Sequence, residues 1–152
     1  MLYLKFTIAG QWYGLPAADI IELVPRLELT RILGVPDYIA GYFNYRGESV
    51  PVVELAKRAA GQPATDAIST RIVIVRYRGR RKLGLLLENA TEIVELDPDT
   101  ANWQTTGVQP SEAYWGDVSL AGNEALQLVK IDQLLPEDVR AILYDEQEAK
   151  SP

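Results

Sequence analysis

Residues 36–55 read PDYIAGYFNYRGESVPVVEL. Two β-prone runs, 42–45 and 50–55, are joined around Arg46-Gly47, where glycine permits a tight corner. This pattern predicts a β-hairpin. Just before it, proline at 36 and glycine at 41 favour a short helix that starts at Pro36 and ends at Gly41.

The residues before this stretch predict further strands. Apolar and polar residues alternate over 2–8, which is the period of a half-buried strand, and a turn at 9–11 leads to a returning strand over 12–15. Residues 19–24 are apolar enough for a strand or for a single helical turn, and both remain open. Pro25 ends this segment.

The rest of the chain also favours short strands. A helical tail is expected at 57–60, and the small, polar residues 61–69 predict a linker. Further strands are expected at 71–77, 82–87, 91–96, 116–120 and 125–131, the last two joined at Gly122-Asn123. Pro136 predicts the start of an amphipathic terminal helix, whose apolar face would carry Val139, Ile142 and Leu143.

The two halves of the chain repeat each other. The spacing from Gly14 to Glu22 recurs from Gly84 to Glu92, and both glycines precede leucine. The spacing from Gly41 to Gly47 likewise recurs from Gly116 to Gly122. Two coincident spacings suggest a duplicated unit of strands and turns, and many short strands favour two small barrels. The sequence therefore predicts a single, mainly β domain over 1–152 with these parts: barrel one at 1–62, barrel two at 68–135, a helix at 136–144 and a polar tail at 145–152.

The composition argues against most catalytic chemistry. The chain has no cysteine and no histidine, which removes thiolate sites, the commonest general base and the commonest zinc ligand. Residues 79–84 have the glycine spacing of a phosphate-binding loop, but Leu85 and Leu86 stand where Lys and Ser/Thr are needed. No catalytic residue, metal ligand or cofactor is expected. Because the beginning lacks a signal-peptide pattern and no apolar run is long enough to span a membrane, a cytoplasmic protein without direct membrane insertion is expected.

Two groups of side chains each have two interpretations. Five cations cluster at the tip of a predicted hairpin: Arg76, Arg78, Arg80, Arg81 and Lys82. They form either a solvated tip that blocks edge pairing or an electrostatic contact with an acidic protein or, less favoured, with nucleic acid. The net charge of −6 disfavours nucleic acid as the main partner. Three aromatic residues in or next to the irregular segment 97–114 form a lid over the second barrel or an exposed patch: Trp103, Tyr114 and Trp115.

The opening stretch resembles the signature of the CheW family of chemotaxis coupling proteins, approximately P-x-[YF]-[IL]-x-G-[VI]-x-N-[LI]-R-G-x-[VI]-[VI]-P-[VI]-[VI]-D-L. Further family patterns are matched in the same order by Phe6, Ile8, Tyr13, Gly14 and Leu15, by Ile20, Glu22 and Leu23, by Gly84 to Ala90, and by Leu128 to Leu135. The resemblance implies two SH3-like, five-stranded β-barrels with short helices. It also implies a non-enzymatic adaptor between the cytoplasmic tip of a chemoreceptor and the regulatory domain of a CheA-type histidine kinase. Recruitment to receptor arrays at the inner membrane would follow, with flagellar chemotaxis or a variant pathway as the output.

The resemblance also assigns roles by position. Ile20 and Glu22 fall at the kinase contact. Six residues fall in or near the receptor groove between the barrels: Gly41, Arg46, Ile72, Val73, Leu83 and Gly84. Because the kinase contact would lie elsewhere, Arg46→Ala is expected to leave kinase binding nearly normal. Core packing of Ile72 and Val73 remains an alternative, Tyr45 departs from the family's aliphatic residue, and a small β-barrel that binds nucleic acid is the competing function.

Overall fold

The computed structural model of the protein describes residues 1–65, 67, 69–96, 102–104, 112–121 and 124–145. The strands of this part of the chain are β1 (Leu2–Ile8), β2 (Gln11–Pro16), β3 (Ile20–Pro25), β4 (Ile39–Tyr45), β5 (Glu48–Glu54), β6 (Arg71–Tyr77), β7 (Arg81–Glu95), β8 (Asn102–Gln104), β9 (Trp115–Ala121) and β10 (Glu124–Val129). The helical segments are η1 (Ala17–Asp19), α1 (Leu55–Ala60), η2 (Ile131–Gln133), α2 (Glu137–Arg140) and η3 (Ala141–Asp145).

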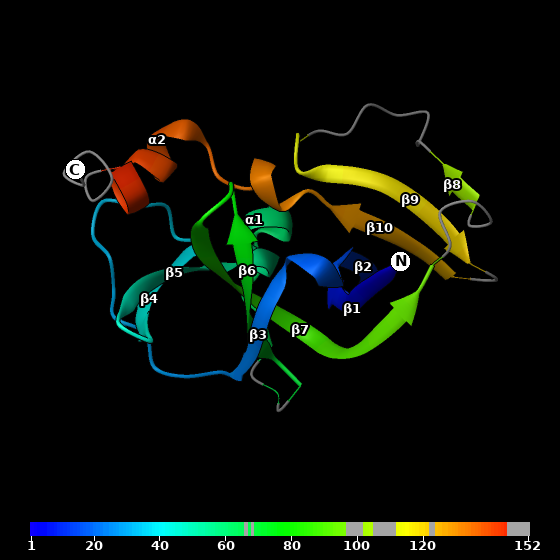
Figure 1. Ribbon diagram of the computed structural model, residues 1–152, viewed down its shortest axis with the longest axis horizontal. Helices are drawn as coiled ribbons and strands as arrows, with labels where there is room; N and C mark the ends of the chain where they lie inside the picture. Colours follow the sequence, from blue (N-terminus) through cyan, green and yellow to red (C-terminus); the bar gives the residue numbers. More distant parts are fainter. Residues whose placement is uncertain (66, 68, 97–101, 105–111, 122–123, 146–152) are drawn as a thin grey trace.

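Two β-subdomains share one long strand (Figure 1). β7 pairs along residues 81–87 with β6 and β5, and along residues 88–95 with β1. The internal subdomain contains β3, β4, β5, β6 and the first half of β7. The terminal subdomain contains β1, β2, β8, β9, β10 and the second half of β7. The predicted mainly β fold is therefore confirmed. Of the segment 19–24, for which a strand and a helical turn are both predicted as possible, residues 20–24 form most of the strand β3, which extends to Pro25.

The strand pairing differs from the predicted division of the chain into one barrel before residues 61–69 and a second barrel after them. β3 follows β2 in sequence but pairs with β6, whereas β1 pairs with β7 and β2 pairs with β10. Residues 61–69 connect α1 to β6 inside the internal subdomain, so they do not separate two barrels. β3, which follows the β1–β2 hairpin, thus covers an edge of β6 in the internal subdomain, and the second half of β7 covers an edge of β1 in the terminal subdomain.

The predicted repeat is confirmed by the registers of the two hairpins. Gly14 lies opposite Lys5 on one side and Leu128 on the parallel strand β10. Gly84 lies opposite Ile74 and Val52 in the same arrangement. A Cβ atom on Gly84 would lie 2.9 Å from Cγ2 of Val52, so glycine permits the close approach of the parallel strand.

β1 is buried on both faces, which corrects the prediction of a half-buried strand. Its polar residues Lys5 and Thr7 are buried together with its apolar ones. A second small core covers the far face, and it consists of Tyr3, Leu96 and Leu126. β1 also lies between β2 and β7, so neither of its edges is free. The ammonium group of Lys5 lies 4.1 Å from the centre of the Trp12 ring, which provides it with a favourable cation–π contact.

The predicted helix between Pro36 and Gly41 is wrong. The amide of Ile39 donates to the carbonyl of Pro36 at 3.1 Å, which makes a single turn, and β4 begins at Ile39. Gly41 lies inside β4 at φ 141°. The residue beside it, Tyr42, pairs with Thr30 through two backbone hydrogen bonds of 2.8 and 2.9 Å. A tertiary pairing thus overrides the local helix signal.

The terminal helix begins after Pro136 as predicted, but its buried face differs. α2 continues into the π-helical η3, where the wider turn places Tyr144 on the side of Val139. Both of these residues are buried, whereas the exposed fraction of Ile142 is 51%. The phenol of Tyr144 donates to the carbonyl of Lys82 at 2.8 Å, which fastens the helix to the internal subdomain.

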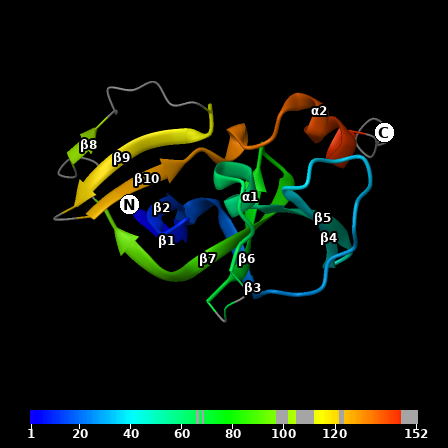
Figure 2. The ribbon, with the colours of Figure 1, turned by 180° about the vertical axis from the view of Figure 1, so that it is seen from behind.

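Arg58 of α1 joins the two subdomains, between which α1 lies (Figures 1 and 2). Its Nε donates to the carbonyl of Leu134 at 3.0 Å. Its guanidinium lies 5.0 Å from the ring centre of Tyr38 and 4.7 Å from that of Tyr114. Tyr114 is buried and packs beside Trp115, as the predicted lid requires, while the side chain of Trp103 lies outside the described residues.

Candidate functional site

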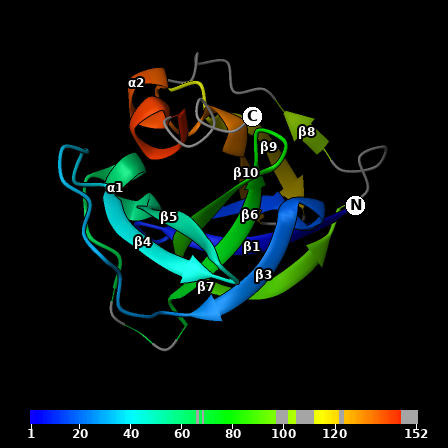
Figure 3. The same ribbon diagram turned by 60° about the vertical axis from the view of Figure 1, so that its left-hand side comes forward.

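A polar cluster joins β3 to the β4–β5 turn, which comes forward in Figure 3. The phenol of Tyr45 donates to Oε1 of Glu22 at 2.6 Å, and Nη2 of Arg46 lies 3.4 Å from the same oxygen. The guanidinium of Arg46 also lies 5.2 Å from the ring centre of Tyr45. We call Glu22, Tyr45 and Arg46 the polar cluster.

The turn that positions Arg46 has an uncommon backbone. Arg46 and Gly47 have φ values of 52° and 85°, as both central residues of a type I′ hairpin turn require. The side-chain oxygen of Asn44 accepts a hydrogen bond from the amide of Gly47 at 3.0 Å. The left-handed conformation of a non-glycine residue is costly, so the hairpin holds Arg46 in place against its local preference.

The cluster is accessible to a partner. The side chain of Arg46 is 78% exposed and that of Glu22 is 40% exposed. Ile20, on the same strand as Glu22, is half-buried and packs against the main core. Glu22, one of the two predicted kinase residues, and the predicted groove residue Arg46 therefore meet on one surface, and the expectation that Arg46 lies apart from the kinase contact is not supported by this geometry.

Substitutions in the cluster are expected to move the pKa of Tyr45 in opposite directions. The hydrogen bond to Glu22 raises this pKa above its ordinary value of 10, and the charge of Arg46 lowers it. Glu22→Gln is therefore expected to lower the pKa of Tyr45, and Arg46→Ala to raise it. The hydrogen bond is present at neutral pH and is lost as the pH rises through the raised pKa. A pH titration of the Tyr45 ring carbon by NMR measures both shifts, and equal pKa values in all three proteins would contradict the cluster.

The other predicted groove residues do not present a surface. Ile72, Val73 and Leu83 are fully buried, so they have no exposed area with which to contact a partner in this conformation. Gly41 and Gly84 permit close backbone approaches. These five residues shape the internal subdomain, and a pattern of apolar strand residues cannot distinguish this role from the lining of a groove.

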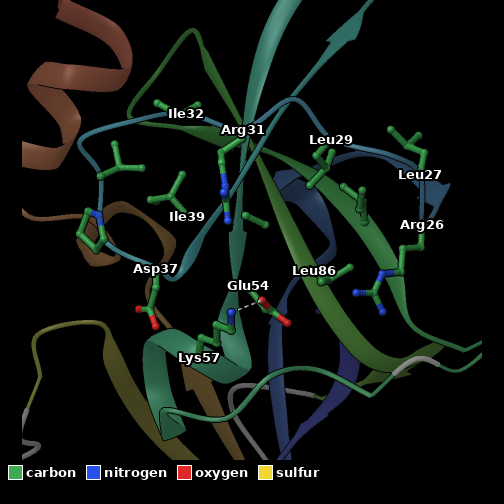
Figure 4. Close-up of a pocket in the computed structure, with 14 residues that line it drawn as sticks. Arg26, Leu27, Leu29, Arg31, Ile32, Asp37, Ile39, Glu54, Lys57 and Leu86 are labelled. Atoms are coloured by element: carbon green, nitrogen blue, oxygen red, sulfur yellow. Dashed lines mark ion pairs between the residues drawn. The ribbon is translucent and has the colours of Figure 1, made fainter.

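A pocket of about 590 Å³ lies beside these buried residues, beneath the loop between β3 and β4 (Figure 4). Ile39, Ile72 and Leu86 are among the apolar residues that line it, and Arg26 and Arg31 reach into it from the loop. The loop is held down where Thr30 pairs with Tyr42. This pocket cannot be predicted from the sequence, because residues 26–37 show no periodicity that would indicate their position.

The pocket contains one buried carboxylate. Glu54 is 7% exposed; its Oε1 accepts a hydrogen bond from the amide of Ala64 at 2.8 Å, and its Oε2 lies 3.6 Å from Nζ of Lys57. A buried charge needs such partners, since it has left water. The carboxylate is thus engaged in fixing residues 61–65 to the end of β5, which suggests a structural role rather than acid–base chemistry.

The described part of the chain shows neither a metal centre nor a spanning helix. Nowhere in it do three or more Asp or Glu side chains converge as they would around a metal ion. None of its helices is both long and apolar enough to cross a membrane.

Comparison with known proteins identifies the fold and the family. The model of the CheW-like domain family matches residues 2–139. The chain is 25% identical over 142 residues to the chemotaxis protein CheW of Klebsiella aerogenes, with 93% of this chain and 85% of that protein covered. It is 20% identical over 136 residues to the chemotaxis protein CheW of Helicobacter pylori, with 90% and 82% covered.

A solved structure has the same fold. It is the crystal structure of the scaffolding protein TtCheW from Thermoanaerobacter tengcongensis, which superposes with a TM-score of 0.81 at 24% identity. The match covers 93% of this chain and 92% of that chain, so it includes both subdomains.

Proposed function

The chain belongs to the family of CheW-like domains, and from this premise we propose that it is a non-enzymatic adaptor that couples chemoreceptors to a CheA-type histidine kinase in a bacterial chemosensory array. The family match over 2–139 carries this proposal. It is supported by the names of the relatives, which are chemotaxis proteins, and by their similar length. The adaptor would act in the cytoplasm, where receptor arrays would recruit it to the inner membrane.

The polar cluster and Ile20 are the proposed contact residues on the internal subdomain. Glu22 and Arg46 carry opposite charges on an exposed surface, and Ile20, two positions before Glu22 in β3, adds a half-buried apolar side chain. A polar rim beside an apolar patch is typical of protein interfaces. We assign Ile20 and Glu22 to the kinase regulatory domain. Arg46 supports this contact through Glu22 and also borders the proposed receptor groove.

The remaining groove residues have an indirect role in this proposal. Gly41, Ile72, Val73, Leu83 and Gly84 set the position of the loop and of the strands beneath it, so they determine the shape of the surface that the receptor tip would contact. The adaptor would act by holding two weak contacts at once, since linkage in an array raises the effective concentration of each partner. A receptor signal would then bias the kinase between two states.

The proposal is tested with the purified chain, the cytoplasmic tip of a chemoreceptor and the regulatory domain of a CheA-type kinase from the same organism. A ternary complex is expected in size-exclusion chromatography, and the intact kinase is expected to respond to the receptor only when the chain is present. Failure of the chain to bind either partner would overturn the adaptor function.

Arg46→Ala is expected to reduce both kinase binding and receptor control of the kinase, because Arg46 contacts Glu22 at the proposed kinase surface. Titration calorimetry measures the first effect and phosphorylation in the reconstituted array measures the second. Arg46→Lys should restore only part of either, since Lys lacks the planar fork of Arg. Lys130→Ala, at an exposed position on the terminal subdomain, is the control. If Arg46→Ala behaves as this control does, the cluster is not part of the contact.

A further inference from the structure

The basic residues at the β6–β7 turn divide into two groups. Arg76 donates to the carbonyl of Ala18 at 2.7 Å, and Arg78 donates to that of Asp132 at 2.9 Å, so this pair binds other parts of its own chain. The other three cations line a separate pocket of about 500 Å³: Arg80, Arg81 and Lys82. The basic residues between positions 76 and 82 therefore do not form a uniformly solvated tip.

This pocket lies between the β6–β7 turn, β5 and η3, and we call it the basic pocket. Apolar side chains form much of its wall, and they are Ile32, Pro51, Ile142 and Leu143. Ile142, which lies in η3, is 51% exposed, so its side chain is accessible to a partner. The basic pocket therefore offers an apolar wall that water still covers.

The charges of the basic pocket do not balance. The one carboxylate among its described lining residues, that of Glu48, lies 2.6 Å from Nζ of Lys82. Arg80 is exposed and forms no ion pair with the described residues. Arg80 therefore presents a positive charge that the described lining does not compensate, although the whole protein carries a net charge of −6. Such a local field attracts an anionic group.

The aromatic floor of the basic pocket limits what the anion can be. The ring of Tyr144 stacks on Tyr77 at 5.7 Å between ring centres, and the guanidinium of Arg81 lies 5.1 Å from the centre of the same ring. Its hydroxyl already donates to a backbone carbonyl. Tyr144 is only 9% exposed, so its ring offers little area for stacking on a planar base, which argues against a nucleotide. Carboxylates attached to an aliphatic chain fit both the charge and the apolar wall.

We propose that the basic pocket docks a short acidic segment of a partner protein. A carboxylate of this segment faces Arg80, and an aliphatic side chain packs on Ile142 and Leu143. The lining of the basic pocket includes no residue of the polar cluster, and it adjoins the pocket beneath the β3–β4 loop through Ile32, which lines both. It therefore adds a docking site to those of the proposed function.

The probe is an acetylated peptide, Glu-Glu-Leu-Glu-Glu, added to the isotope-labelled full chain. Amide shifts are expected at Ser49, Lys82 and Leu143, and they should shrink as salt is added, because salt screens exposed charges. The matching peptide with glutamine in place of glutamate should not bind. Inorganic phosphate at equal ionic strength should not displace the acidic peptide.

Two variants and a control locate the site. Arg80→Glu is expected to raise the Kd of the acidic peptide about fivefold or more. This is the change in affinity that the loss of one exposed ion pair produces, and the reversed charge adds repulsion. Ile142→Ser is expected to weaken it as well, whereas Lys130→Glu, with the same change in charge on the terminal subdomain, should not. The proposal is overturned if the shifts lie elsewhere, if the glutamine peptide binds equally, if phosphate displaces the peptide, or if Arg80→Glu has no more effect than Lys130→Glu.

Discussion

Replacing Arg58 by alanine is expected to lower the free energy of unfolding by about 3 kcal/mol, because a charge-assisted hydrogen bond and two cation–π contacts are lost together. The side chain of Arg58 is only 14% exposed, so water cannot readily replace these contacts. The carbonyl of Leu134 would lose its partner, and Tyr38 and Tyr114 would no longer be joined across the two subdomains.

Urea denaturation measures this loss, and the melting temperature should fall by about 6–12 °C. Arg58→Lys should recover part of the stability, since its ammonium can reach only some of the same groups. Arg31→Ala, which removes an arginine from an exposed loop position, should change stability by less than about 0.5 kcal/mol. A loss in Arg58→Ala no larger than in Arg31→Ala would show that Arg58 does not join the subdomains.

Arg58→Ala should also change the pKa values of Tyr38 and Tyr114. Burial raises the pKa of Tyr38 and of Tyr114, and the positive charge of Arg58 lowers both. Removal of that charge should therefore raise both pKa values further, which an NMR titration of the ring carbons detects. A variant that merely loosened the whole fold would instead bring these pKa values back toward 10.

Gly41→Ala is expected to cost about 4 kcal/mol, because backbone strain and a steric clash act together. The φ of 141° at Gly41 is rarely adopted by a residue with a side chain, and a Cβ atom would lie 2.5 Å from the carbonyl oxygen of Thr30. That oxygen belongs to the backbone and accepts a hydrogen bond from Tyr42, so it cannot move without breaking the pairing that holds the β3–β4 loop.

Urea denaturation and amide exchange at Thr30 and Tyr42 measure this effect. Gly47→Ala is the matched control, because Gly47 also has a positive φ but has no atom within 4 Å of its Cβ position. It should cost only about 1 kcal/mol. Equal losses for the two variants would mean that the clash with Thr30 contributes nothing and that strain alone determines the cost.

The elements that depend on local signals could be predicted from the sequence. The hairpin around Arg46-Gly47 and the helix after Pro136 depend on turn residues and proline, which act within a few positions. The repeat was visible in the spacing of Gly14 and Gly84 because a parallel strand approaches both glycines closely. The positions of strands and turns therefore required little tertiary information.

The features that depend on distant segments could not be predicted. The family resemblance gives Glu22 and Arg46 separate roles. Their contact exists only because β3 does not continue the β1–β2 hairpin but pairs with β6. The π-helical turn that buries Tyr144 and exposes Ile142 has no local sequence signal. It is stabilised by the hydrogen bond from the Tyr144 hydroxyl to the carbonyl of Lys82, which is distant in the sequence. Tyr45 departs from the family pattern, but the sequence does not identify Glu22 as the partner of its hydroxyl.

The exchange of strands between the subdomains also governs how the chain can fold. β1 and β2 are synthesised well before their partners β7 and β10, with which they pair only after all the strands between have been made. Many native contacts thus join residues far apart in sequence, and a high contact order slows folding. The internal subdomain is contiguous, since β3 to the first half of β7 follow one another in the chain, whereas the terminal subdomain is assembled from segments on both sides of it. The terminal subdomain therefore cannot be completed until β10 has been made. Until β7 and β10 are present, the edges of β1 and β2 that they cover remain exposed to other chains.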